Sequence, residues 1–100
     1  MDNIEIGEKY LPIGTVVLLK GATKRIMITG FCSFDFENES KVWDYNGCLY
    51  PEGILVSTQN CLFQHDQIEK IYHMGLADDQ EEKEFKKVID KLTSHEKKAN

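Results

Sequence analysis

The sequence lacks long apolar runs and is poor in positive charge. No stretch approaches the roughly 20 consecutive apolar residues that a membrane-spanning helix needs. Residues 1–5 have neither the basic start nor the apolar core of a signal peptide, so we expect no export by the general route. Lys and Arg number 12 against 17 Asp and Glu, a net charge of -5. Phosphate backbones and anionic lipid repel such a chain, so we expect no nucleic-acid or membrane partner.

The sequence also lacks close cysteine pairs, so the spacing of its three cysteines is unsuited to a metal site. Cys32, Cys48 and Cys61 are an odd number without a close C-x-x-C pair, which favours reduced thiols and a cytoplasmic location. The best metal-binding candidate is Cys61 with His65, and Cys48 and His73 lie far from both in sequence. Structural zinc sites usually have two close ligand pairs, so we expect neither metal nor cofactor.

The remaining composition is that of a soluble domain. With 41% hydrophobic and 29% charged residues, 7 Gly and 2 Pro, the 100-residue chain predicts one compact domain over residues 1–98. Residues 15–20 form a short apolar run rich in β-branched side chains, and 25–29 resume it after a turn at 21–24. These two runs predict an antiparallel hairpin. The second strand continues to Phe36, and Gly30 is a candidate bulge within it.

Further short strands follow, separated by turn residues. Residues 41–45 predict a strand, and Asn46-Gly47 is typical of a turn or bulge. Residues 50–53 predict a β-turn that leads into a strand at 54–56, and 57–60 predict a polar loop.

A helical turn at 65–68 and a strand at 70–74 complete the β-rich part. About five short strands with one helical turn before the last are the elements of an SH3-like barrel, which we predict over residues 10–75. An OB-like barrel or a curled open sheet fits the pattern almost as well. The fold class is therefore α+β, with a small antiparallel β-barrel and a C-terminal amphipathic helix.

The last part of the chain predicts that helix, over residues 78–93. Asp78 and Glu81 have the spacing of a capping box, and acidic residues precede basic ones along the segment. One apolar stripe has the spacing i, i+3, i+4 and i+7. Its members are Phe85, Val88, Ile89 and Leu92. This stripe either packs on the barrel or docks onto a partner, and residues 94–100 are expected to be a disordered tail.

Catalytic motifs are weak. A thiol nucleophile would require Cys61 beside His65 or His73, and no motif fixes that arrangement. Asp44 and Glu52 flank turns and carry no specificity as an acid/base pair. Residues 21–24 lack the spacing of a phosphate-binding loop. We therefore expect a protein that is not an enzyme.

Aromatic residues are concentrated between residues 31 and 50, where they either fill the core or grip a peptide. Base stacking would need a basic groove, and this interval carries only Lys41 against four acidic residues. Candidate protein-binding residues are three aromatics of this interval and the helix stripe. They are Trp43, Tyr45, Tyr50, Phe85, Val88, Ile89 and Leu92.

Three stretches resemble the signatures of a small Gram-positive bacterial family, domain of unknown function 4176. The first is residues 10–30, which begin Tyr10-Leu11-Pro12-Ile13-Gly14; the second is residues 44–53, Asp44 to Gly53; and the third begins at Phe63 and leads to Gly75. The resemblance covers about residues 10 to 90.

Members of that family are typically encoded beside type VII secretion genes and LXG-type toxins. The resemblance implies a cytosolic chaperone or adaptor whose partner is an LXG-type toxin or another type VII secretion component, and it implies no catalytic residue. An immunity protein that blocks a toxin active site is a rival interpretation. A small enzyme using Cys61 and His65, or a nucleic-acid-binding barrel, are further alternatives.

Overall fold

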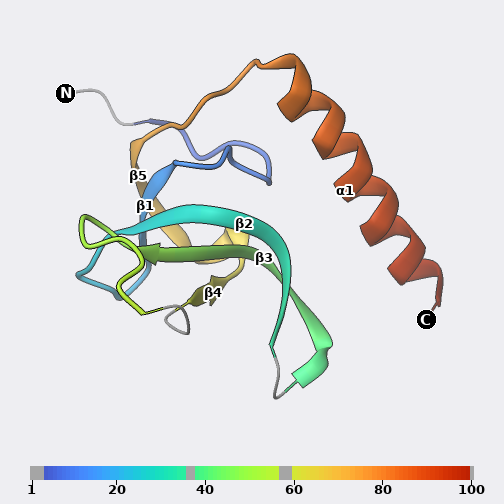
Figure 1. Ribbon diagram of the computed structural model, residues 1–100, viewed down its shortest axis with the longest axis horizontal. Coiled ribbons are helices and arrows are strands. Elements are labelled where there is room, and N and C mark those ends of the chain that lie inside the picture. Colours follow the sequence, from blue (N-terminus) through green and yellow to red (C-terminus); the bar gives the residue numbers. More distant parts are fainter. Residues whose placement is uncertain (1–3, 36–37, 57–59, 100) are drawn as a thin grey trace.

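The computed structural model describes residues 4–35, 38–56 and 60–99, and the side chains of these residues except for 32–40 and 92–99 (Figure 1). The described residues form, in chain order, five strands with a 3₁₀ turn before the last of them, and then one α-helix. Their bounds are β1 (Val16–Leu19), β2 (Ile26–Asp35), β3 (Asn38–Leu49), β4 (Cys61–Phe63), η1 (His65–Gln67), β5 (Ile68–His73) and α1 (Gln80–Ala99). The predicted α+β class, with five strands and a C-terminal helix, is confirmed.

The strands form one antiparallel sheet in the order β4-β3-β2-β1-β5. Among the described residues β4 and β5 are its two ends, so the sheet is open and the predicted closure into an SH3-like barrel is not confirmed. Ile4 adds an isolated bridge to Ile71 at the outer side of β5. The N-terminal segment therefore covers part of one sheet edge.

The β1–β2 hairpin has the predicted position and antiparallel pairing, with Val17 opposite Ile26. The predicted irregularity at Gly30 is also present, because the β2–β3 register shifts between Ile28 and Gly30. An extra residue in one strand increases its local bend and twist. Figure 1 shows the bend of β2 and β3 at the end of the sheet nearer to α1.

The middle of the chain departs from the prediction at two places. Asn46-Gly47, predicted to be a turn or a bulge, is not a turn but lies inside β3, opposite the β2 register shift between Ile28 and Gly30. Gly47 is also opposite Cys61 of β4. A Cβ on Gly47 would stand 2.6 Å from Cγ2 of Ile26, so the glycine is required by close packing and not by a turn. Residues 54–56 form no strand, and the fourth strand is instead the three-residue β4. The predicted loop at 57–60 falls mostly outside the described residues.

The core lies on one face of the sheet, and its buried side chains come from every strand. Tyr45 and Phe63 are fully buried and stack with ring centroids 5.1 Å apart. The other buried members of this cluster are Leu11, Val17, Ile26, Ile28, Ile68 and Ile71. Alternation along the start of β2 places Ile26 and Ile28 on the inner face, as expected for a sheet covered on one side.

Helix α1 begins at Gln80, one residue later than a cap at Asp78 would predict. Oδ2 of Asp79 accepts a hydrogen bond from the Glu82 amide at 3.3 Å, so Asp79 and not Asp78 caps the helix. Asp78 has a positive φ of 57° and forms the bend before it. The helix continues to Ala99, so the predicted tail from residue 94 is helical up to that point.

The apolar stripe of α1 is only partly covered. Ile89 is 2% exposed, whereas Phe85 and Val88 are 50% and 48% exposed. The side chain of Leu92 lies outside the described residues. The helix therefore packs on the rest of the molecule and also presents apolar surface to solvent.

Candidate functional site

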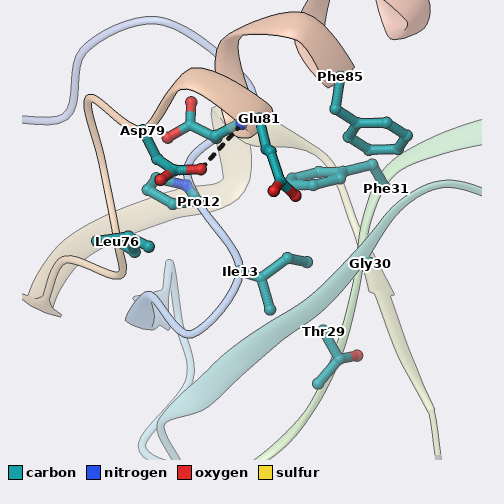
Figure 2. A pocket seen from close by; sticks show the side chains of 10 residues that line it. Pro12, Ile13, Thr29, Gly30, Phe31, Leu76, Asp79, Glu81 and Phe85 are labelled. Carbon is teal, nitrogen blue, oxygen red and sulfur yellow. Dashed lines mark hydrogen bonds between the residues drawn. The ribbon is translucent and has the colours of Figure 1, made fainter.

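A groove of about 430 Å³ lies between the start of α1, the bend of β2 and the segment before β1. Its walls are mostly apolar, with Phe31 and Phe85 at one end, Leu76 at the other and Ile13 between them (Figure 2). Pro12 and Gly30 complete the apolar lining. We call this site the α1 groove.

The groove exists because two segments about 60 residues apart approach very closely. A Cβ on Gly75 would stand 2.1 Å from the carbonyl oxygen of Ile13, so no other residue fits there without moving the backbone. The Gly75 amide donates to Oγ1 of the fully buried Thr15 at 3.0 Å. Gly14, with φ of 92°, donates to the carbonyl of Ile28. This junction brings Leu76 to the groove.

Phe31 joins the groove to the core. Its ring lies 6.0 Å from that of Phe85 on the groove side. On the core side it lies 5.9 Å from Tyr10, edge to face, and 6.0 Å from Tyr45. Aromatic rings at these separations attract one another beyond the effect of their burial. The chain of rings anchors one wall of the groove to the most buried part of the sheet.

The rim of the groove is acidic. Its acidic residues are Asp79, which caps α1, and Glu81 and Glu82 in the first turn of the helix. Glu82 pairs with Lys86 at 3.1 Å through one carboxylate oxygen, and its other oxygen is buried and accepts no hydrogen bond from the described residues. An apolar groove with a negative rim suits an apolar side chain flanked by lysine or arginine.

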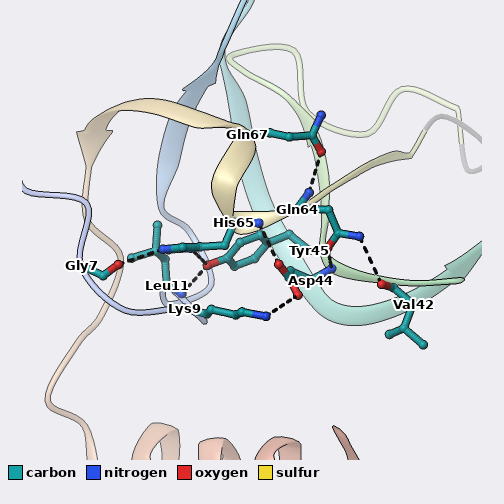
Figure 3. Close-up of polar contacts among 9 residues, drawn as sticks. All are labelled: Gly7, Lys9, Leu11, Val42, Asp44, Tyr45, Gln64, His65 and Gln67. Carbon is teal, nitrogen blue, oxygen red and sulfur yellow. Dashed lines mark hydrogen bonds and ion pairs between the residues drawn. The ribbon is translucent and has the colours of Figure 1, made fainter. Parts of the chain in front are cut away.

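A second constellation surrounds the Tyr45 hydroxyl (Figure 3). This oxygen accepts from the Leu11 amide at 3.1 Å and lies 2.7 Å from Nδ1 of His65. Nε2 of His65 lies 2.8 Å from the Gly7 carbonyl, which can only accept. A proton on Nε2 therefore satisfies both contacts, with Nδ1 accepting from the tyrosine hydroxyl. Both ring nitrogens are engaged, and they tie the N-terminal segment to β3 and η1.

Asp44 strengthens the same connection. One of its carboxylate oxygens accepts from the His65 amide at 2.8 Å, and the other pairs with Lys9 at 3.3 Å. The Gln64 side chain accepts from the Asp44 amide and donates to Val42. Glu52 is engaged elsewhere, with Lys24, and this lowers its pKa. Each of the two acids considered as an acid/base pair is thus occupied by a different lysine.

The thiols near this region are free. Cys48 is buried and Cys61 is partly buried, and neither forms a disulfide. Burial raises the pKa of the Cys61 thiol, and nearby Cys48 adds to the increase. The side chain of Cys32 lies outside the described residues. Among the residues that the structure describes, no three His, Cys, Asp or Glu side chains gather as a metal site would require.

Residues 10–85 match the family model described as Domain of unknown function (DUF4176). The chain belongs to this family. Neither a curated protein nor a solved structure matches it. The part of the DUF4176 protein that matches contains the whole lining of the α1 groove, from Pro12 to Phe85. The described residues include no helix with the length and apolar character needed to cross a membrane.

The structure separates the candidate binding residues of this DUF4176 protein. Tyr45 is fully buried and Ile89 is 2% exposed, so both serve the packing of the fold. Trp43 is half-buried under the ammonium of Lys41, 4.1 Å from the ring centroid. Tyr50 is 36% exposed and stacks on Arg25, far along the sheet from Phe85 and Val88. Phe85 is the candidate that lines the groove.

Three groove residues, Pro12, Ile13 and Leu76, were not predicted as binding residues from the sequence. Ile13 is 50% exposed and Leu76 is 73% exposed, although both are apolar and flank glycines. The sequence pattern that could have identified Ile13 and Leu76 is their position beside Gly14 and Gly75, because a glycine next to an apolar residue can mark a close approach of two backbone segments.

Proposed function

We propose that this DUF4176 protein is a cytoplasmic, non-catalytic accessory of type VII secretion, a chaperone or adaptor that binds an LXG-type toxin. The proposal is supported by the family membership and by the gene neighbourhood that the family resemblance implies. It requires a surface on which another protein can be held, and the α1 groove is the best candidate among the described residues.

The observation that carries the proposal is the exposed apolar surface around the groove. Ile13, Leu76, Phe85 and Val88 are each between 48% and 73% exposed, and the first three line one cavity. Contiguous apolar surface on a soluble protein is typical of an interaction site, whereas scattered apolar residues are not. Covering it with a partner would contribute about 25 cal/mol per Å² removed from water.

The acidic rim indicates the chemistry of that partner. Asp79, Glu81 and Glu82 line the groove, and Glu82 is already paired with Lys86. A helix with a row of apolar side chains and with lysine or arginine beside them would fill the lining and neutralise the rim. We propose that the helical N-terminal part of the toxin supplies such a segment.

The absence of catalysis is part of the proposal and has physical support. A cysteine nucleophile needs a lowered pKa, and the pKa of Cys61 is raised. His65, the base considered for it, uses both ring nitrogens in contacts with Tyr45 and Gly7. Neither Cys61 nor His65 lines the groove.

Co-expression with the neighbouring LXG protein, followed by size-exclusion chromatography, tests the proposal. We expect a stable complex with the wild-type protein and its loss with Leu76→Asp. Leu55→Asp is the matched control, because Leu55 is also 73% exposed but lies outside the groove. Failure of the wild-type protein to form any complex would contradict the proposed function.

Truncated toxins separate a chaperone from an immunity protein. A chaperone or adaptor is expected to bind the N-terminal helical part or the junction, and an immunity protein the C-terminal toxic domain. Retention by the C-terminal domain alone would replace the chaperone role with the immunity role.

We also propose that the open, bent sheet is an SH3-like arrangement. The strand order, the bulged and bent β2, and the single 3₁₀ turn between β4 and β5 support this finer description. An experimental structure with a flat sheet, or with another strand order, would contradict it.

A further inference from the structure

A second surface, with the opposite charge, lies at the other end of the sheet. The guanidinium of Arg25 stands 5.0 Å from the ring centroid of Tyr50 and 5.3 Å from that of Tyr72. The ammonium of Lys70 lies 4.7 Å from the Tyr72 centroid. We call Arg25, Tyr50, Lys70 and Tyr72 the basic aromatic face. The rings hold both cations in place by cation–π attraction.

The strands explain why these four residues meet. The amide of Tyr50, just after β3, donates to the carbonyl of Arg25, just before β2. In β1, Val17 is opposite Ile26 of β2, and the next residue, Leu18, is opposite Lys70 of β5. Leu18 therefore lies between Arg25, which precedes Ile26, and Lys70. The face is therefore positioned by strand pairing at the ends of β2 and β3, beside a β1–β5 pair whose register shifts between Leu18 and Leu19.

The two cations of this face are electrostatically unsatisfied. Among the described residues, neither Arg25 nor Lys70 forms an ion pair. Residues 20–25 add Lys20 and Lys24 and contain no acid. Glu52 pairs with Lys24 at 2.6 Å, and Glu69 is the sequence neighbour of Lys70. A positive surface on a protein of net charge -5 calls for a negative partner.

Apolar side chains border the face. Ile54, Leu55 and Val56 are 59%, 73% and 51% exposed. Their loop is held beside the face, because the Gly53 amide donates to the Leu49 carbonyl and Glu52 pairs with Lys24. Figure 1 shows the β1–β2 turn and this loop at the end of the sheet away from α1.

We propose that the basic aromatic face binds an acidic, leucine-containing segment of a second protein. One carboxylate pairs with the outer edge of Arg25, which its two rings orient, a second pairs with Lys70, and an apolar side chain packs on residues 54–56. The inference deepens the proposed adaptor role and rests on it: the protein joins a basic toxin segment in the α1 groove to an acidic partner at the far end.

A protein partner fits this surface better than a nucleic acid. The cations are few, the overall charge is negative, and an aliphatic loop borders them, whereas a nucleic-acid groove needs many cations along its length. Nucleic-acid binding is therefore an outcome that the test can reveal and that would overturn the proposal.

The test measures the fluorescence anisotropy of two fluorescein-labelled 12-residue peptides. The acidic peptide contains Glu, Leu and Gly, and the basic peptide has Lys in place of every Glu. We expect the acidic peptide to bind the wild-type protein, and Arg25→Ala with Lys70→Ala to weaken binding by about tenfold or more. Arg25→Lys keeps the charge but loses the planar fork, so we expect an intermediate loss. Leu76→Asp, in the α1 groove, is expected to leave the acidic peptide bound.

Three results would overturn the inference: no saturable binding of the acidic peptide, equal binding by the double variant, or tighter binding of a 12-nucleotide oligothymidylate. Thermal melts establish that the double variant is folded. The toxin complex is measured in parallel with the same variants. If the wild-type protein forms no toxin complex, the proposed function is contradicted. If the double variant keeps the toxin complex but loses the acidic peptide, the two surfaces act separately, which is the result we expect.

Discussion

The hydroxyl oxygen of Tyr45 and Nδ1 of His65 lie 2.7 Å apart at the centre of the connection between the N-terminal segment and the sheet. The tyrosine ring is fully buried, yet its hydroxyl meets both an imidazole and the Leu11 amide. A buried hydroxyl with partners on both sides stabilises the fold, and its removal leaves those partners unsatisfied.

Tyr45→Phe is therefore expected to lower the free energy of unfolding by roughly 1–3 kcal/mol. The ring packing is kept, so the loss reports the hydroxyl alone. Urea unfolding followed by circular dichroism measures it. Tyr50→Phe, at a ring that is 36% exposed, is the control and should change stability by less than about 0.5 kcal/mol. Equal effects of the two substitutions would contradict the assignment.

Burial raises the pKa of Tyr45 from its ordinary value of 10.0 to about 12, with a smaller opposing effect of the Leu11 hydrogen bond and a further increase from the Asp44 charge. The folded state thus keeps the phenol proton more tightly than the unfolded chain. This contribution to stability is complete below pH 10 and is lost as the pH rises from 10 to 12, by up to about 3 kcal/mol.

Urea unfolding of the wild-type protein and of Tyr45→Phe across pH 9 to 12 tests this pH dependence. The advantage of the wild-type protein should shrink as the pH rises, because the variant lacks the titrating group. Parallel curves for the two proteins across that range would show that Tyr45 does not titrate as expected.

Gly75→Ala is expected to destabilise the protein by roughly 1–3 kcal/mol or more, because its Cβ would stand 2.1 Å from the Ile13 carbonyl oxygen. Gly7→Ala is the matched control, since no atom lies within 4 Å of a Cβ there. Thermal denaturation compares the two. If both variants melt at the same temperature, the close approach of residues 13 and 75 is wrong.

Ile89→Ala is expected to cost about 2–5 kcal/mol, because Ile89 is 2% exposed. Val88→Ala, its neighbour at 48% exposure, should cost less than about 1 kcal/mol. Both substitutions raise helix propensity, so the difference reports the packing of α1. Similar melting temperatures for the two variants would indicate that α1 does not pack through this side chain.

Local patterns were sufficient for the features that depend on neighbouring residues. The β1–β2 hairpin follows from two apolar runs separated by a turn, and the 3₁₀ turn at His65–Gln67 falls within the predicted helical turn at 65–68. The stripe containing Phe85 and Ile89 predicted α1. The sequence pattern could not distinguish Asp78 from Asp79 as the cap, because Asp78 precedes Glu81 by the same three residues as Asp79 precedes Glu82. The structure has the cap at Asp79.

Features set by distant contacts were not predictable in this way. Residues 54–56 are aliphatic enough for a strand, yet no neighbouring strand pairs with them, while the three-residue β4 is a strand only because β3 lies beside it. The α1 groove depends on the approach of Gly75 to Ile13, which no local pattern encodes.

The ring of Phe31 touches Phe85 outside and two tyrosines inside. A ligand that enters the α1 groove and displaces Phe85 therefore changes the surroundings of Tyr10 and Tyr45 without contacting either residue. Spectroscopic signals of these tyrosines would then report whether the α1 groove is occupied, so no attached dye is needed to detect binding there.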